Sequence, residues 1–219
     1  MLRIIKLLIY ISLINLLLFS CSLYNNGFDS LSPISNHEEY YNEYYPLELG
    51  VRKDYLKIEI GEVTNKPKQW RSEKIIKFGM FELTIASKLQ KVPVYKMQIN
   101  FYVGDDMIDE KYQYIIPMKE GIVFTDVIGP YLTIEIERFV PTSKKYLSVL
   151  KRLGFDAMYG SNISENLEEG EFLEVKKEID VYGITKTRSY IYKKDFGLSS
   201  DKSLLNGIPI ESSKFIKTK

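Results

Sequence analysis

The feature that most constrains the fold is an alternation of apolar and polar side chains across residues 94–103. The apolar positions are every second residue, namely Tyr95, Met97, Ile99, Phe101 and Val103. Successive side chains of a β-strand point to opposite faces, so this pattern is typical of a strand with one buried and one solvated face. Gly104-Asp105-Asp106 follows as a turn, and residues 111–116 return as the partner strand. The segment therefore predicts an antiparallel hairpin.

Most of the chain beyond residue 47 carries the same kind of signal. Further strands are expected at residues 55–60, 75–86 with a break at Gly79, 121–128, 131–139, 171–182, 185–193, and near Ile208. About eight or nine antiparallel strands in sequence indicate a sandwich or a barrel. The predicted fold class is mainly β, an antiparallel β-sandwich or barrel-like domain with one packed α-helix.

The helix is expected at residues 144–153. Its apolar residues recur at helical spacing, and they are Tyr146, Leu147, Leu150 and Leu153. Pro141-Thr142-Ser143 precedes the segment, and Gly154 follows it as a C-terminal cap. This is the only segment after residue 47 in which helical spacing replaces alternation, so one helix is predicted to pack on the sheet.

The N-terminus has the organisation of an export signal. Arg3 and Lys6 precede an apolar run from Leu7 to Phe19. Crossing the hydrocarbon core takes roughly 20 apolar residues, so this run is too short for a transmembrane helix and fits a signal peptide over residues 1–20. An uncleaved anchor and an ordinary secretory leader are the alternatives.

The leader ends in Leu18-Phe19-Ser20-Cys21, and Cys21 is the only cysteine. These residues resemble the lipobox of bacterial lipoproteins, with the loose consensus typical of spirochaetes. The resemblance covers only the signal region and names no family for the rest of the chain. It implies that Cys21 carries lipid, including palmitate, and anchors the protein in the bilayer of the cell envelope. Ser22, where an aspartate would favour inner-membrane retention, implies the outer membrane.

Residues 21–45 are predicted to be a lipidated cysteine and a flexible tether, followed by a single mainly β domain over residues 46–219. Few aliphatic residues lie between Ser22 and His37, so little apolar surface is available for burial there. A run of tyrosines then precedes Pro46, comprising Tyr40, Tyr41, Tyr44 and Tyr45. Two interpretations are open: an aromatic contact surface for a protein or glycan, or packing of the rings onto the core.

Charge and residue inventory argue against several functions. The leader holds two of the 30 basic residues and none of the 29 acidic ones, which leaves 28 against 29 in the mature chain and no global field to attract nucleic acid. The single histidine, His37, falls in the predicted tether, and the single cysteine is assigned to lipid. A catalytic triad and a zinc site of the usual types therefore lack their residues. No glycine-rich nucleotide motif is present. We predict a non-catalytic protein without a cofactor or metal, although a pair of carboxylates brought together by folding stays open.

Trp70 is the third candidate contact residue, with Tyr44 and Tyr45. It is the only tryptophan and lies in the basic segment Lys66-Pro67-Lys68-Gln69-Trp70-Arg71, which is expected to be a loop. The ring is either a binding tip for a sugar or an acidic partner, or it folds back onto the core. Asp105, Asp106, Asp109 and Glu110 cluster at the predicted hairpin tip, but they lack the spacing of an EF-hand loop, so a solvated turn is favoured over a calcium site.

The sequence thus predicts a membrane-anchored envelope lipoprotein that acts by binding a surface or periplasmic ligand. The alternatives are a structural or assembly component of the outer-membrane envelope, and a lipid carrier. A large apolar pocket would favour carriage of a lipid, whereas a flat apolar patch would favour a protein partner.

Overall fold

The computed structural model describes residues 27–34, 40–59, 68–160 and 171–218 of the chain. Its strands form one antiparallel sheet of 11 strands, which confirms the predicted mainly β class. The strands are β1 (Arg52–Glu59), β2 (Gln69–Ile85), β3 (Lys88–Val103), β4 (Asp106–Pro117), β5 (Gly121–Thr125), β6 (Arg138–Pro141), β7 (Phe155–Gly160), β8 (Phe172–Val181), β9 (Ile184–Lys193), β10 (Gly197–Leu205) and β11 (Ile208–Thr218).

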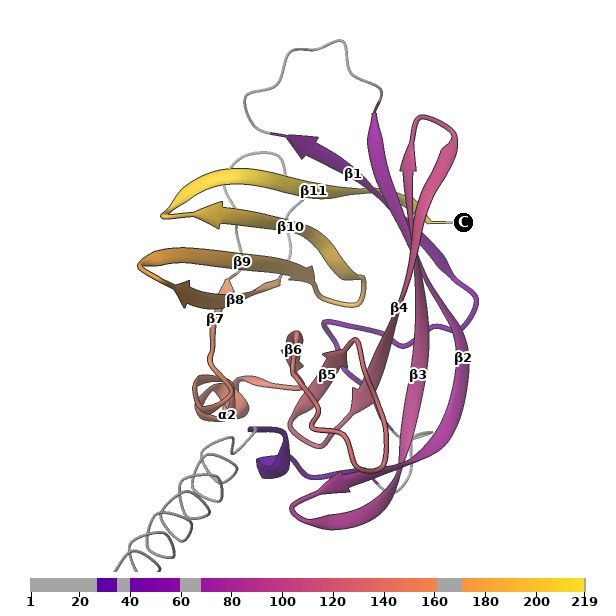
Figure 1. Cartoon of the computed structure of the whole chain (residues 1–219), viewed down its shortest axis with the longest axis vertical. Coiled ribbons are helices and arrows are strands. Elements are labelled where there is room, and N and C mark those ends of the chain that lie inside the picture. The colour runs from indigo at the N-terminus through magenta and orange to yellow at the C-terminus, as the bar shows by residue number, and fades with distance from the viewer. Residues whose placement is uncertain (1–26, 35–39, 60–67, 161–170, 219) are drawn as a thin grey trace, which may run out of the picture.

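The order of strands makes the sheet barrel-like. It runs β6-β5-β4-β3-β2-β1-β11-β10-β9-β8-β7, so the first and last strands of the chain pair with one another. The two edges, β6 and β7, are consecutive in the chain. In Figure 1, β8 to β11 run across the direction of β2 to β4, which shows how far the sheet bends. The result is a nearly closed barrel.

The predicted helix lies at the seam between the two edges. It consists of a 3-10 turn, η2 (Lys144–Tyr146), followed by α2 (Leu147–Arg152). Helix α2 contacts both β6 and β7, and Leu150 is fully buried in the core. Gly154 has a φ of 80° and its N–H donates to the Lys151 carbonyl at 3.1 Å, as expected of a C-terminal cap. No helix in the described part of the chain is both long enough and apolar enough to cross a bilayer.

Three strand predictions need correction. Strand β2 runs through Gly79 without a break, and its irregularity is a shift of register between Ile75 and Lys77. Residues 131–137 are not a strand, although Ile134 and Ile136 are buried as alternation predicts, and only Arg138–Pro141 pairs as β6. The strands β7 and β10 were not expected from sequence. β10 has the polar run Ser199 to Ser203, so alternation does not mark it.

The boundary predicted at residue 46 is also wrong for the residues that the structure describes. Phe28, in the 3-10 turn η1 (Gly27–Ser30), and Leu31 are 2% and 3% exposed, and they belong to the same core as the sheet. Tyr44 and Tyr45 are 3% and 7% exposed and belong to it too. The segment has few aliphatic residues, but its aromatic rings supply enough apolar surface for burial in the core. Cys21 and His37 lie outside the described residues.

The apolar core fills one end of the barrel. Its fully buried members come from β2 to β6, α2 and the C-terminal strands, and they include Leu83, Val92, Ile115, Met118, Ile122, Phe124, Phe139, Leu150, Leu173 and Leu198. Around the middle of the barrel the inward-facing side chains change from apolar to charged. This change of character positions the candidate site.

Candidate functional site

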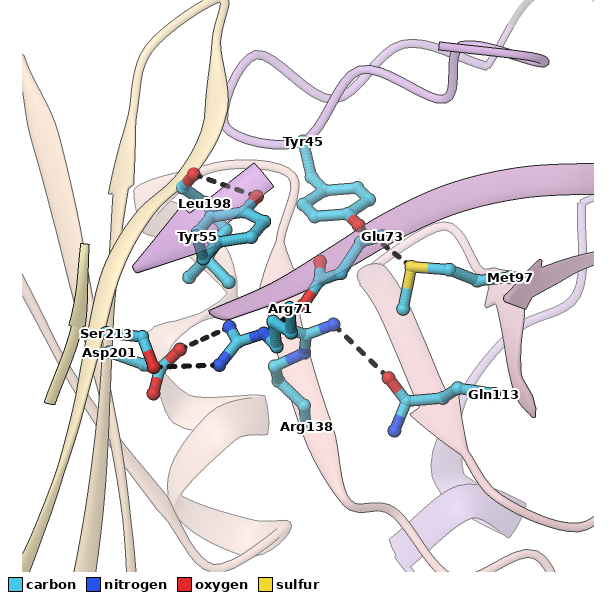
Figure 2. Close-up of polar contacts among 10 residues, drawn as sticks. All are labelled: Tyr45, Tyr55, Arg71, Glu73, Met97, Gln113, Arg138, Leu198, Asp201 and Ser213. Atoms are coloured by element: carbon cyan, nitrogen blue, oxygen red, sulfur yellow. Dashed lines mark hydrogen bonds and ion pairs between the residues drawn. The ribbon is translucent and has the colours of Figure 1, made fainter. Parts of the chain in front are cut away.

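Arg71 is one of two arginines in the interior of the barrel, and it joins strands that are distant in the sheet. It projects inward from β2 because it alternates with outward-facing Trp70 and Ser72. Its Nη2 is 2.5 Å from Asp201 Oδ2 on β10, and its Nη1 donates to Ser213 Oγ on β11 at 3.0 Å (Figure 2). Its Nε donates to Glu73 Oε1 at 3.0 Å. One side chain therefore connects β2 to both β10 and β11 across the barrel.

Arg138, on β6, is the second interior cation, and its surroundings are different. It is only 5% exposed. Its Nη2 donates to Gln113 Oε1 at 3.2 Å (Figure 2). Its Cζ lies 3.9 Å from the centroid of the Phe124 ring and 5.3 Å from that of Tyr190. Within the described residues no carboxylate oxygen lies within 4.0 Å of an Arg138 nitrogen.

Buried tyrosines separate these charges from the apolar core. Tyr55 donates its hydroxyl to the Leu198 carbonyl at 3.2 Å, and Tyr45 donates to Met97 Sδ at 3.6 Å (Figure 2). The Tyr192 hydroxyl is buried and has no hydrogen-bond partner among the described residues. Burial raises the pKa of all three phenols above the ordinary value, so they are neutral hydroxyls at physiological pH.

Above this layer the barrel contains a cavity of about 340 Å³, hereafter the central cavity. That volume is at the lower end of the range for small-molecule sites. Most of its lining is charged or polar, with six basic and five acidic side chains. The lining residues are Arg71, Glu73, Ile99, Phe101, Lys111, Tyr112, Gln113, Asp126, Glu137, Arg138, Lys186, Arg188, Tyr190, Asp201, Lys202, Ser203, Ile210 and Glu211.

A larger share of the acidic than of the basic side chains of the central cavity is in ion pairs. Glu73 and Asp201 pair with Arg71, and Glu211 lies 3.7 Å from Lys57 Nζ. In contrast, no ion pair within the described residues involves the basic side chains Lys111, Arg138, Lys186 or Arg188. The arrangement therefore leaves several positive charges around one hollow without a fixed counter-charge.

Trp70 lies on the outer side of the same wall. It is in strand β2 and not in the loop expected from sequence, because Gln69 to Arg71 pair with β3 and Trp70 faces Tyr102. The two rings stack with centroids 3.7 Å apart and planes at 2°. Trp70 Nε1 donates to the Gly104 carbonyl at 2.7 Å, and Arg52 Cζ lies 5.2 Å from the ring. The half-buried ring thus has most of its contacts supplied by the sheet itself.

A smaller cavity of about 250 Å³ lies beside Trp70. Its lining includes Trp70 and Tyr102, and it shares Arg71, Phe101 and Glu211 with the central cavity. Of the three contact residues predicted from sequence, Trp70 lines this cavity, and Tyr45 lines a much smaller hollow of about 20 Å³. Tyr44 and Tyr45 are in the core, which corrects the expectation of a contact surface and agrees with the packing interpretation.

The acidic residues of the β3–β4 hairpin do not line the central cavity, and Asp109 lines the smaller cavity. Asp105, Asp106, Asp109 and Glu110 are exposed. Within the part of the chain that is described, no three histidine, cysteine, aspartate or glutamate side chains are placed to hold a metal ion.

Sequence reasoning missed the residues that line the central cavity. A usable signal was present, because Arg71 and Glu73 occupy alternate positions of one strand, as do Lys186, Arg188 and Tyr190 of another. Charged residues repeated with period two on the inward face predict a polar interior. That inward face could be recognised only once the neighbouring strands and their register were known.

The fold and the cavity define a class of protein: a single antiparallel sheet, bent into a nearly closed barrel with a charged interior. No family model matches the sequence, and no curated protein matches it. Among solved structures it is similar to a candidate lipoprotein from Parabacteroides distasonis, with 8% identity and a TM-score of 0.47 over 83% of this chain and all of that one. It is also similar to a candidate exported protein with a YmcC-like fold from Bacteroides fragilis, with 7% identity and a TM-score of 0.39 over 82% of this chain and all of that one. Neither likeness bears on function.

Proposed function

We propose that this chain is a lipid-anchored protein of the bacterial envelope that binds a small polar ligand in the central cavity. The observation that carries the proposal is the charge in the lining: of the six basic side chains around a hollow of about 340 Å³, four have no ion-pair partner among the described residues, and one of these four, Arg138, is buried. Burying charge without compensation is unfavourable, so a protein keeps such a site when a bound group compensates for it.

Binding is proposed in preference to catalysis because of the functional groups in the cavity. Among the described residues its lining contains no histidine, cysteine or threonine, and three of its five carboxylates, those of Glu73, Asp201 and Glu211, are in ion pairs. General acid–base chemistry needs a group that is free to exchange a proton with the substrate. Arginine, the most buried cation of the site, does not lose its proton in proteins.

The lining also argues against the lipid-carrier alternative for this cavity. An acyl chain gains its binding free energy from contact with apolar surface. Of the described side chains around the central cavity, only Ile99, Phe101 and Ile210 are purely apolar, and Tyr112 and Tyr190 carry hydroxyls. A ligand with several polar groups is the better match.

Retention of a ligand in the cavity tests this proposal. Wild-type protein in a nonionic detergent is dialysed to equilibrium against small molecules extracted from the source cells and their medium, and mass spectrometry identifies what it retains. Ser203→Trp places a large ring in the cavity from β10, whereas Ser148→Trp places it on the exposed side of α2. We expect at least one compound to be retained by the wild type and by Ser148→Trp, and lost from Ser203→Trp. Retention of nothing, or equal retention by Ser203→Trp once circular dichroism shows that it is folded, would contradict the proposal.

The membrane anchor has a separate test. Cys21→Ala is expected to abolish incorporation of labelled palmitate and to release the protein from the membrane fraction, because the thiol is the site of lipid attachment. Ser22→Ala, one residue further on, keeps the label and serves as the control. Undiminished labelling of Cys21→Ala would exclude the lipoprotein assignment.

A role in envelope assembly is the second candidate, and one surface favours it. Exposed apolar side chains gather at the tips of the β8–β9 and β10–β11 hairpins, where Val181, Tyr182, Ile184, Leu205 and Ile208 are located. The tips are joined, because Thr185 and Asn206 exchange hydrogen bonds of 2.9 and 2.8 Å. Apolar patches of this kind mark contacts with other proteins. If Tyr182→Ser with Ile208→Ser removes a cross-linked envelope partner that Ser203→Trp retains, the assembly role is supported; an unchanged set of cross-links would argue against it.

A further inference from the structure

We propose that the group bound in the central cavity is an oxyanion, a carboxylate, phosphate or sulfate, held by the guanidinium of Arg138. This inference rests on the proposed binding function and names the chemistry of the ligand. It follows from the burial of Arg138, from its hydrogen bonds and from the placing of the neighbouring charges.

Arg138 is unusual because it is buried without a carboxylate. Its guanidinium has five N–H donors in a planar fork and is always charged. Its Nη2 donates to the neutral amide oxygen of Gln113 at 3.2 Å, and the guanidinium also hydrogen-bonds to the hydroxyl of Tyr45. Phe124 and Tyr190 contribute cation–π contacts. These contacts stabilise the charge, but none of them is with an anion.

Gln113 contacts Arg138, but its side-chain amide is neutral and cannot supply the negative charge of an anion. Its Nε2 donates to Asp126 Oδ1 at 3.0 Å, which orients its amide oxygen toward Arg138. Asp126 thus reaches Arg138 only through a neutral amide. An oxyanion in the cavity would supply the charge and the pair of acceptors that a guanidinium binds best.

The neighbouring charges direct an anion to this place. Two of the carboxylates that line the cavity, Glu73 and Asp201, are bound to Arg71. Arg188 and Lys186 are exposed at the open part of the cavity, and Glu137 is the carboxylate among them. The positive charges therefore extend from the entrance to buried Arg138, which attracts anions into the cavity.

Thermal unfolding of the full-length protein in a nonionic detergent tests the inference. Inorganic phosphate, sulfate and citrate at about 10 mM are each compared with sodium chloride of equal ionic strength. A ligand that binds the folded state raises the melting temperature in proportion to its saturation of the site. These anions also stabilise proteins by exclusion from the surface, so the diagnostic quantity is the difference between variants.

Two variants remove cations of the cavity and one removes a cation elsewhere. Arg138→Met keeps an apolar stem over Phe124, Arg188→Gln changes an exposed side chain, and Arg152→Gln is the control on α2. We expect at least one oxyanion to raise the melting temperature of the wild type and of Arg152→Gln. In Arg138→Met its affinity should fall by about tenfold or more, since hydrogen bonds to a charged group are lost. In Arg188→Gln the affinity for the oxyanion should fall a fewfold. If Arg138→Met does not fold, the result with Arg188→Gln tests the inference.

The outcomes separate this inference from the proposed function. A rise with phosphate or sulfate alone indicates a phosphate or sulfate ligand, and a rise with citrate alone indicates a carboxylate; either supports the proposal. If no oxyanion acts, or if the rise is unchanged in both Arg138→Met and Arg188→Gln, the inference is overturned. If dialysis then shows a neutral compound that the wild type retains and Ser203→Trp loses, the proposed binding function stands although the oxyanion inference fails. Retention of no compound in dialysis contradicts the binding function itself.

Discussion

At the scale of single residues, the middle of the barrel is held together by the polar contacts of Arg71 and not by apolar packing. Its partners Asp201 and Ser213 are more than 120 positions away along the chain and belong to two different strands. A buried ion pair gives little net stability, because removing charges from water opposes their attraction. Removing one partner is costly, since the remaining charge stays buried.

Arg71→Met is therefore expected to lower the free energy of unfolding by about 3 kcal/mol, because Glu73 and Asp201 lose their partner. Urea denaturation measures the change. Arg152→Met, at an exposed site on α2, is the matched control and should stay within about 0.5 kcal/mol. A loss below about 1 kcal/mol for Arg71→Met would show that the pair is solvated and that the cavity is wetter than described.

The buried tyrosines predict a loss of stability at alkaline pH. Burial raises the pKa of Tyr192, so the phenol stays protonated in the folded chain and ionises above pH ~10 only on unfolding. The unfolded state then binds fewer protons, so stability is complete below pH ~10 and falls as the pH rises further. Tyr192→Phe should reduce the slope of unfolding free energy against pH by about 1.4 kcal/mol per unit above that pH. Tyr131→Phe, at an exposed position, should leave the slope unchanged. Equal slopes in both variants would mean that Tyr192 is accessible to hydroxide.

At the scale of elements, the sequence predicted strands wherever one face is apolar and the other polar. Strand β3 was found for that reason, while β10 was missed because Asp201 and Ser203 face a polar cavity. The helix was found because its apolar spacing and Gly154 agree. The position of Trp70 in β2 was not found, because Lys66-Pro67-Lys68 suggested a loop and the pairing with Tyr102 is made across the sheet.

The edge formed by β5 and β6 depends on Gly121. A Cβ at this position would lie 2.6 Å from Phe139 Cζ and closer still to the Val140 carbonyl oxygen. Gly121→Ala is expected to lower the free energy of unfolding by about 3 kcal/mol, since β6 must move away. Gly79→Ala, in β2, meets only the flexible end of the Phe81 side chain and should change stability by less than about 1 kcal/mol. Comparable values for the two variants in urea would show that β5 and β6 are not tightly paired.

At the scale of the whole molecule, the fold depends on the pairing of its first and last strands. Strand β11 pairs with β1 from Glu59 to Lys53, and this pairing joins the N-terminal meander of β1 to β6 to the C-terminal meander of β7 to β11. The contacts of Arg71 with Asp201 and Ser213 join β2 to β10 and β11, so they depend on this pairing. Sequence alone could not place them, because they depend on how far the sheet bends.

Removal of residues 208–219 is therefore expected to abolish cooperative unfolding, because it exposes the edges of β1 and β10 and removes Phe215 from Tyr55. Removal of Lys219 alone is the control and should leave the transition unchanged. Circular dichroism during heating measures both. A cooperative transition in the shortened chain would show that the two meanders fold without the β1–β11 pairing.

The central claim is that the charged interior of the barrel is a binding site. Equilibrium dialysis of the wild type beside Ser203→Trp and Ser148→Trp tests it most directly, because the two tryptophans differ only in whether they occupy the cavity. We expect a small polar compound that the wild type and Ser148→Trp retain and that folded Ser203→Trp does not. Equal retention by all three proteins, or by none, would contradict it.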